Sequence, residues 1–456
     1  MKKILLVFFA ASLTSSIFAA SKNEKSRFEK LELFNKVLNL IENQYYREVD
    51  TEKLIHGAIK GMMETLDPHS AFLNKEFFSK MQEDTKGEFG GLGLEVTQKD
   101  GVLVVITPID DTPAFRAGIK PGDKIVEINH ESTIGLTLDE AVEKMKGKPR
   151  SIVNVGIARD GVEGIQYFKI KRETIKIKSV KSDLISKNFI FVRLSSFQKG
   201  AGNEIASAIR KLSSRAKKNG GVKGIILDLR FNGGGLLDEA VNVSSIFLKS
   251  GIVVSSEARD PKDKEFRYVK KTGYKDLETP LVVLINGASA SASEIVAGAL
   301  QDSKRALVMG TNSFGKGSIQ TVTPLDDENG IKITIAQYMT PKGTKIQAIG
   351  IRPDVVLDDI DNDLFLKSRK DSNYIREIDL RNHLTATFET KEEEKVRLKR
   401  EKEERIKRVQ RIKDQSKKKD SKQDEMVKFD PKKDYQVLQA IRFLKSFKIY
   451  KSMLSK

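Results

Sequence analysis

The chain contains 456 residues, which is enough for two or three domains with a sizeable hydrophobic core. It has no cysteine, so a disulfide framework and catalysis by a thiolate are both excluded. The formal net charge of +18 is unevenly distributed and concentrates in a stretch near the C-terminal end.

The first twenty residues have the layout of an export signal. A charged head, Met1 to Lys3, precedes an apolar stretch from Ile4 to Ala11, and small residues follow up to Ala20. This apolar stretch is too short to cross a membrane as a helix. We therefore expect a cleavable signal peptide over residues 1–19, with an uncleaved anchor as the alternative.

Residues 26–85 are predicted to form an N-terminal helical region. Apolar residues recur there at intervals of three and four, as on one face of an amphipathic helix. The run from Asp50 to Glu52 can cap a second helix. We expect these helices to pack together or onto a partner subunit. The apolar positions of the first helix include Phe28, Leu31, Phe34, Leu38 and Ile41.

Residues 86–173 have the alternating pattern of a β-rich domain. A glycine-rich turn, Gly91-Leu92-Gly93-Leu94, lies near the start of this region, and the segment from Ala117 to Asp123 follows it along the chain. Together the two segments resemble those of a PDZ domain of the bacterial protease type. Backbone N–H groups of Gly91, Leu92, Gly93 and Leu94 can form a nest for a peptide's terminal carboxylate, and the adjacent strand can add the peptide as a further strand. A purely structural β-domain with an empty groove is the alternative.

Residues 174–358 alternate between strands and helices, which predicts an α/β domain with crossover helices. One apolar strand ends in Asp228 and runs into Asn232-Gly233-Gly234-Gly235. A second, from Leu281 to Ile285, leads into a run of small residues and hydroxyls that ends at Glu294. Farther on, Lys316 stands between two glycines.

Several kinds of chemistry lack support. The segment from Gly310 to Lys316 imitates a phosphate-binding loop, but Gly317 replaces the hydroxyl residue that would hold magnesium, and a strand pattern follows instead of a helix. No histidine lies near the serine run or in metal-ligand spacing, so neither a Ser-His-Asp triad nor a zinc site has local support. No cofactor is expected. The histidines are His56, His69, His130 and His383.

The remaining chemistry is nucleophilic catalysis by a serine with a lysine as general base. A lysine acts as a base only when it is neutral, which near pH 7 requires burial among apolar groups. Ser289, Ser291 and Ser293 all lie at the strand-to-helix turn, and the residues alone do not choose among them, because each can instead cap the helix. The N–H groups of Ala292 and Gly234 are candidate donors to the oxyanion of the transition state.

These segments resemble those of the carboxyl-terminal processing proteases, also called tail-specific proteases, over residues 27–358. The resemblance implies a crotonase/ClpP-like α/β core with an inserted PDZ domain and flanking helical regions. It also implies that Ser291 is the nucleophile, Lys316 the general base and Gln320 the residue that orients the lysine. Phe231, beside the glycines, departs from the family pattern and is expected to influence substrate preference.

The region 359–456 is predicted to be helical and charged. Residues 391–422 carry 15 basic and 8 acidic residues, in a pattern that fits a solvated, ion-paired helix. A basic surface of this kind can also contact an anionic membrane or the cell wall. Nucleic acid is not an expected partner, because no recognition motif accompanies the charge. A last amphipathic helix, Tyr435 to Phe447, is expected to fold back on the core.

Taken together, the sequence predicts an exported serine endopeptidase in the periplasm or cell envelope of a bacterium. It is expected to recognise protein or peptide substrates by their free C-termini through the PDZ domain and to cleave near those ends. A homo-oligomer and an activating adaptor are both compatible with this prediction. The alternative is a proteolytically inert PDZ scaffold, or an adaptor that binds membrane or wall through the basic segment.

Overall fold

The computed structural model describes residues 27–99, 101–109, 111–260, 262–326, 328–357, 377 and 429–454. The predicted signal peptide, residues 1–19, and the basic segment, residues 391–422, lie outside the described residues. The chain divides into two compact units, one ending at Phe72 and the other beginning at Leu73. Within the described ranges, none of the helices combines the length and the apolar composition that crossing a membrane would require.

The first unit is helical, as predicted. Residues 27–44 form one helix and α2 spans Thr51–Glu64. The side chain of Asp50 accepts a hydrogen bond from the backbone N–H of Lys53 and caps α2, which confirms the predicted helix start. A short strand, β1 (Ala71–Leu73), follows. Within the described residues, the first helix leaves a row of apolar side chains exposed: Phe28, Leu31, Phe34, Val37 and Leu40.

A two-stranded ribbon joins the inserted β-domain to the rest of the second unit. Helix α3 (Lys75–Lys86) ends at Gly87, which adopts the left-handed conformation that glycine tolerates best. Strand β2 (Glu88–Gly91) then pairs antiparallel with β9 (Glu173–Lys176), so that Glu88 lies opposite Lys176. The chain therefore enters and leaves the domain side by side.

The inserted domain is an antiparallel sheet in the strand order β3-β4-β5-β7-β8, with the short β6 paired to β5. Helix α5 begins with a capping box between Thr137 and Glu140. The core of the inserted domain consists of buried aliphatic side chains, among them Leu103, Ile125 and Val155. Strand β3 pairs only with β4 within this sheet, so its other edge is available to a further strand. The elements are β3 (Leu94–Lys99), β4 (Val102–Pro108), α4 (Pro113–Arg116), β5 (Lys124–Ile128), β6 (Glu131–Ser132), α5 (Leu138–Met145), β7 (Ile152–Ala158) and β8 (Ile165–Lys171).

The α/β core is built on a sheet in the order β10-β11-β12-β15-β16-β19, in which every pair from β11 onward is parallel. Parallel strands need crossover connections, and helices α6, α7 and α8 provide them. The elements are β10 (Val180–Ile185), β11 (Phe189–Leu194), α6 (Ala201–Ala216), the 3-10 turn η1 (Lys217–Asn219), β12 (Gly224–Asp228), α7 (Leu237–Phe247), β15 (Leu281–Ile285), α8 (Ala292–Asp302), β16 (Leu307–Gly310) and β19 (Val355–Val356).

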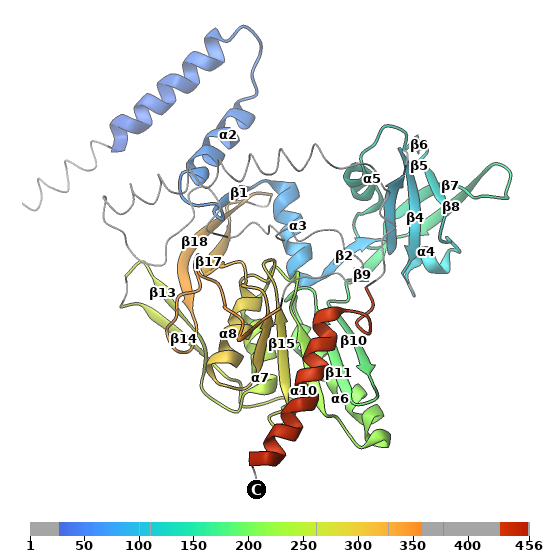
Figure 1. Ribbon diagram of the computed structural model, residues 1–456. Coiled ribbons are helices and arrows are strands. Elements are labelled where there is room, and N and C mark those ends of the chain that lie inside the picture. Colours follow the sequence, from blue (N-terminus) through green and yellow to red (C-terminus); the bar gives the residue numbers. More distant parts are fainter. Residues whose placement is uncertain are drawn as a thin grey trace, which may run out of the picture. The chain divides into compact units, whose positions relative to one another are not determined.

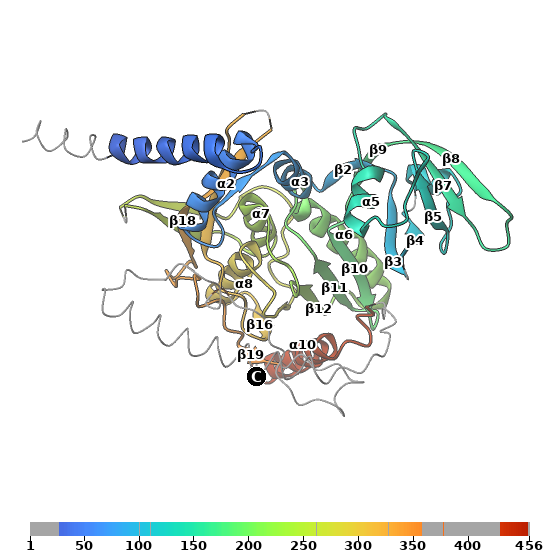
Figure 2. The ribbon, with the colours of Figure 1, turned by 90° about the horizontal axis from the view of Figure 1, so that it is seen from above.

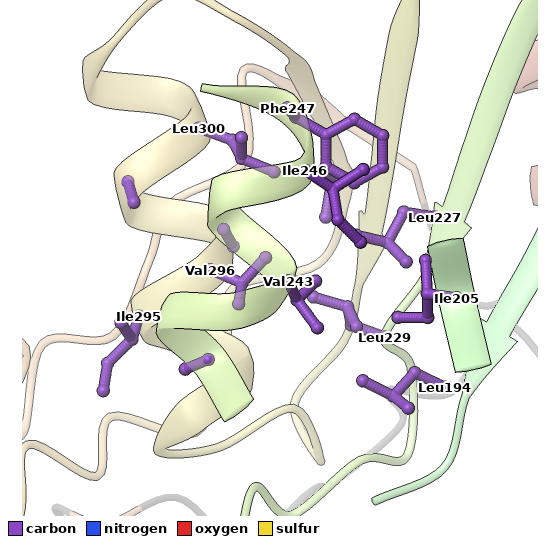
Figure 3. Close-up of a cluster of buried hydrophobic side chains, with 14 of the residues drawn as sticks. Leu194, Ile205, Leu227, Leu229, Val243, Ile246, Phe247, Ile295, Val296 and Leu300 are labelled. Carbon is purple, nitrogen blue, oxygen red and sulfur yellow. The ribbon is translucent and has the colours of Figure 1, made fainter. Parts of the chain in front are cut away.

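One face of this sheet packs against the three crossover helices. Figure 3 shows Leu227 and Leu229 of the β12 segment facing the helices α6, α7 and α8, whose side chains Ile205, Val243 and Val296 belong to the same buried cluster. Because the central strands are covered on both faces, they read as continuous apolar runs in the sequence rather than as alternating patterns.

The opposite face of the sheet is covered by the C-terminal helix α10 (Tyr435–Leu454). Figures 1 and 2 show α10 running along the sheet on the side away from α6, α7 and α8. Its buried residues Val437, Ala440, Ile441 and Leu444 pack onto side chains of β11, β12 and β15. Leu444 lies so close to Gly224 that a side chain there would meet it at 2.8 Å. The predicted return of the last helix to the core is confirmed.

A second, antiparallel sheet flanks the core. Strand β18 (Gly330–Met339) pairs with both β13 (Ile252–Ala258) and β17 (Ser318–Pro324), and β13 also pairs with β14 (Lys264–Tyr268). The loop that carries Lys316 lies between β16 and β17 and so connects the two sheets.

The docking of α10 generates a first prediction. Leu444→Ala should lower the free energy of unfolding by about 2–5 kcal/mol, because a buried leucine is replaced by a cavity beside Gly224. The measurement is chemical denaturation of the full chain. Arg442→Ala, on the exposed side of the same helix, is the matched control and should change stability by less than about 0.5 kcal/mol. Equal losses in the two variants would contradict the packing described here.

Candidate active site

Ser291 lies at the sharp turn between β15 and α8, directly before the first residue of the helix. Its backbone adopts φ 55° and ψ −113°, a combination that residues with a side chain rarely occupy. A serine held on a strained strand-to-helix turn presents its hydroxyl above the edge of the sheet, and this geometry is typical of nucleophilic serines.

The surroundings of the three candidate serines differ. Ser289 is fully buried, and its hydroxyl donates to the carbonyl of Leu229 at 2.8 Å. Ser293 is also fully buried, and its hydroxyl donates to the carbonyl of Asn232 at 2.8 Å. Ser291 is the partly exposed member of the three. Ser289 and Ser293 therefore tie the turn to the neighbouring loop, while Ser291 is accessible to a substrate.

The glycine loop, residues 231–235, lies against the serine turn. A side chain at Gly234 would approach Cβ of Ser291 to 2.8 Å and the backbone nitrogen of Ala292 to 3.0 Å, so this position has room for glycine alone. The N–H of Gly234 donates to Oδ1 of Asn232 at 2.9 Å. Ala292 is the first residue of α8, so its N–H belongs to the helix N-terminal groups that have no acceptor within the helix. Both predicted oxyanion donors thus lie beside Ser291, one of them engaged by Asn232.

Lys316 lies on the loop before β17, between Gly315 and Gly317, and is half-buried. Its Nζ donates a hydrogen bond to Oε1 of Gln320 at 2.7 Å. The amide of Gln320 in turn donates to the hydroxyls of Ser318 at 2.9 Å and Thr334 at 3.2 Å, which fixes the orientation of its oxygen toward the lysine. The structure therefore brings together the lysine and the glutamine that the sequence suggested as a pair.

Glu294 joins the serine turn to the lysine loop. The carboxylate is fully buried, and its Oε2 accepts the backbone N–H groups of both Ser291, at 2.8 Å, and Lys316, at 2.9 Å. Its Oε1 accepts the hydroxyl of Ser313 at 2.5 Å and the N–H of Gly315 at 2.7 Å. Both backbone N–H groups bond to the same oxygen. The backbone nitrogens of Ser291 and Lys316 are therefore separated by no more than the sum of these two hydrogen-bond lengths.

Burial raises the pKa of Glu294 to about 7 from its ordinary value of 4.5, even though the four hydrogen bonds favour the charged form. Sequence reasoning assigned no role to this residue. The one available signal was the capping-box spacing, in which a serine is followed three residues later by a glutamate at the start of an apolar helix.

The predicted carboxylate-binding turn spans the end of β2 and the start of β3. Gly93 adopts φ 77°, and any side chain there would collide with Thr112 at 2.4 Å. Leu92 is buried in the core of the inserted domain, with Gly91 before it and Leu94 after it. The turn therefore lies at the start of the unpaired edge of β3, where an added peptide strand would end.

Comparisons with known proteins agree with this organisation. A model of peptidase family S41 matches residues 188–357, and a PDZ-domain model matches residues 80–158. A third model, described as the N-terminal domain of the activating protease CtpB, matches residues 9–77.

Two curated relatives cover most of the chain. A carboxy-terminal-processing protease of Bartonella bacilliformis is 43% identical over 353 residues, which are 77% of this chain and 81% of that protein. The carboxy-terminal processing protease CtpA of Bacillus subtilis is 34% identical over 369 residues, 78% of each. Among solved structures, a photosystem II D1 C-terminal processing protease is 31% identical and covers 72% of this chain and 92% of its own, with a TM-score of 0.42.

The predicted family and fold class are therefore confirmed. The S41 match falls on the α/β core that carries Ser291 and Lys316, and the PDZ match covers strands β3 to β7 of the inserted antiparallel sheet. The chain belongs to the carboxy-terminal processing proteases of peptidase family S41, which makes it a serine-type peptidase that carries a PDZ domain.

Proposed function

We propose that the chain is an exported endopeptidase that captures the C-terminus of a protein in its PDZ groove and cleaves nearby with Ser291 and Lys316. The observation that carries this proposal is the position of Glu294, whose single oxygen Oε2 binds the backbones of both residues. Two loops that are remote in sequence are thereby tied to one carboxylate oxygen, which supports the assignment of a nucleophile to one loop and of its base to the other.

In the proposed reaction, neutral Nζ of Lys316 takes the proton of the Ser291 hydroxyl as Oγ attacks the carbonyl carbon of the scissile bond. The carbonyl π pair moves to the oxygen, which the N–H of Ala292 stabilises together with an N–H of the glycine loop. Collapse of this intermediate breaks the C–N bond, and the leaving amine takes the proton from the Lys316 ammonium. Water then attacks the acyl group by the same steps and restores the serine.

Gln320 has a positioning role in this proposal. Its side-chain oxygen accepts a hydrogen bond from Nζ of Lys316 and so fixes the orientation of that amine. Hydrogen bonds to Ser318 and Thr334 prevent a 180° flip of the Gln320 amide. A lysine base that is fixed in this way loses little rotamer entropy on reaching the transition state.

The PDZ domain is proposed to supply recognition of substrate C-termini. The edge of β3 can add a substrate strand, and the turn of Gly91, Leu92, Gly93 and Leu94 can bind the terminal carboxylate. Such a mode favours unfolded or frayed tails, because an extended strand can reach both the groove and the active site.

Export, location and partners also belong to the proposal. Export rests on residues 1–19, and a periplasmic or envelope location follows from it. The match of residues 9–77 to the N-terminal domain of the activating protease CtpB supports a role of this region in partner contacts, with a second copy or an adaptor as partner. The basic segment 391–422 is proposed to contact the membrane or the cell wall peripherally.

Ser291→Ala and Lys316→Ala should each lower the cleavage rate at least about a thousand-fold, because the nucleophile or its base is removed. The measurement is proteolysis of an unstructured protein with a free apolar C-terminus by the purified mature chain. Ser214→Ala and Lys342→Ala, both at exposed positions, are matched controls that should still cut. Cleavage by both site variants at the wild-type rate would overturn the assignment, and a wild type that never cuts would favour the inert scaffold.

Glu294 should make stability depend on pH in an unusual direction. Its pKa is about 7 in the folded chain and 4.5 ordinarily, so between these values the folded state holds a proton that the unfolded state has released. The stabilisation is complete below pH 4.5 and is lost as the pH rises through 7, by about 3 kcal/mol in total. The test compares the free energy of unfolding of the wild type with that of Glu294→Gln across this range. A difference between the two that does not change with pH would contradict the prediction.

Amidation of the substrate's terminal carboxylate should slow cleavage about ten-fold or more, because the PDZ turn loses its charged partner. The measurement is kcat/KM for two synthetic peptides that differ only in a free or amidated C-terminus. A control peptide of the same sequence, with a free C-terminus and an acetylated N-terminus, should be cleaved as fast as the unmodified peptide. Equal rates for the free and amidated tails would remove carboxylate capture from the proposal.

A further inference from the structure

We propose that the start of the C-terminal helix positions the glycine loop of the active site. In this inference Asp434 is a positioning residue that acts through Arg230, and it touches neither substrate nor the reacting atoms. The inference rests on the proposed function of Ser291 and the glycine loop, and it adds a segment outside residues 188–357, the part that the S41 family model matches.

Arg230 is almost completely buried, with 5% of its side chain exposed. Its Nε and Nη2 donate to the two oxygens of Asp228 at 2.8 and 2.9 Å, in the fork-to-fork arrangement that fixes a guanidinium in its plane. Its Nη1 donates to Asp434 at 3.1 Å and to Gln436 at 2.9 Å. The partners of Nη1 therefore come from the C-terminal helix, about two hundred residues away in sequence.

Aromatic contacts add to this attachment. The ring of Phe429, just before α10, lies under the guanidinium of Arg193 at 4.6 Å and near that of Arg230 at 5.9 Å. Arg193 also approaches Asp228, at 3.8 Å, and the ring of Phe231, at 5.9 Å. Residues 429–436 thus contact the carboxyl end of β12 through charged and aromatic groups.

Arg230 leads directly into the loop that touches Ser291. Phe231 follows it with φ 59°, a strained backbone held by a hydrogen bond of its N–H to Oδ1 of Asn286 at 3.0 Å. Asn232 comes next and is fully buried, with its carbonyl bound to Ser293 and its amide to Leu194. Gly234 then lies against Ser291. A shift of Arg230 can therefore reach the nucleophile through a few consecutive residues, of which Asn232 and Gly234 are buried.

Two functions of α10 can be separated in the structure. Val437, Ala440, Ile441 and Leu444 supply apolar packing onto the sheet, which any stable helix needs. Asp434 supplies the ion pair with Arg230 and also caps the helix, since its Oδ1 accepts the N–H of Val437 at 2.9 Å. A serine at position 434 would keep the cap but is too short to reach Arg230.

The test uses the full chain and compares Asp434→Ser and Asp434→Asn with Leu444→Ala, which weakens the packing of the same helix. The readouts are kcat and KM on an unstructured protein with a free C-terminus, thermal unfolding, and hydrogen exchange of the backbone amides of residues 231–236. Asp434→Ser should lower kcat about ten-fold, with KM changed less than about two-fold, because a displaced loop weakens transition-state binding more than substrate binding. Exchange in the loop should become faster.

Asp434→Asn keeps one acceptor oxygen for Nη1 and should recover part of the lost kcat. Leu444→Ala should lower the unfolding temperature at least as much as Asp434→Ser while retaining the wild-type kcat at temperatures where it is folded. Wild-type kcat and loop exchange in Asp434→Ser would overturn the inference. It would also be overturned if Leu444→Ala lost kcat to the same extent, since α10 would then act through stability alone.

A failure of the positioning role of Asp434 can be distinguished from a failure of the proposed catalytic function. If Ser291→Ala still cleaves, the catalytic assignment is wrong, whereas the exchange of residues 231–236 reports the contact of Asp434 with the loop without reference to catalysis. Unchanged exchange in Asp434→Ser would overturn the positioning role even where Ser291→Ala is inactive.

Discussion

The candidate active site depends on the fully buried carboxylate of Glu294. Glu294 brings four donors from two separate segments onto two oxygen atoms, and it does so within the first turn of a helix whose N-terminus favours negative charge. An isolated carboxylate would not remain charged at such a position, and the raised pKa expresses that cost. The same burial makes the arrangement specific, because any other placement of the two loops would leave several buried N–H groups without a partner.

The topology of the core explains why these loops meet at all. Strands β12, β15 and β16 are adjacent and parallel, so their carboxyl ends lie along one edge of the sheet. The glycine loop follows β12, the serine turn follows β15 and the lysine loop follows β16. The second sheet then receives the chain from the lysine loop and provides Thr334, which holds Gln320 in place. Each element of the site thus begins where a strand ends, and small residues allow the close approach.

Much of this organisation could be predicted from local patterns. The apolar strands, the glycines after Asp228 and the lysine between glycines are all contiguous signals, and the resemblance to a known family selected Ser291 among three serines. The contacts of Glu294 could not be predicted in the same way, because they join residues about twenty positions apart through backbone groups that carry no sequence signature. The pairing of Arg230 with Asp434 was even less accessible, since it spans 204 residues and depends on which face of α10 meets the sheet.

The ribbon formed by β2 and β9 has a consequence for how such a protein can be assembled. Because β2 and β9 are paired, with Glu88 opposite Lys176, the chain enters and leaves the inserted domain through the two arms of a hairpin, and an ion pair of Lys146 with Glu83 adds a further contact. The length and content of the intervening sequence then matter little to the register of the core, and closing a longer loop adds only a slowly growing entropic cost. A different recognition domain can therefore be inserted between the same two strands while the α/β core is unchanged.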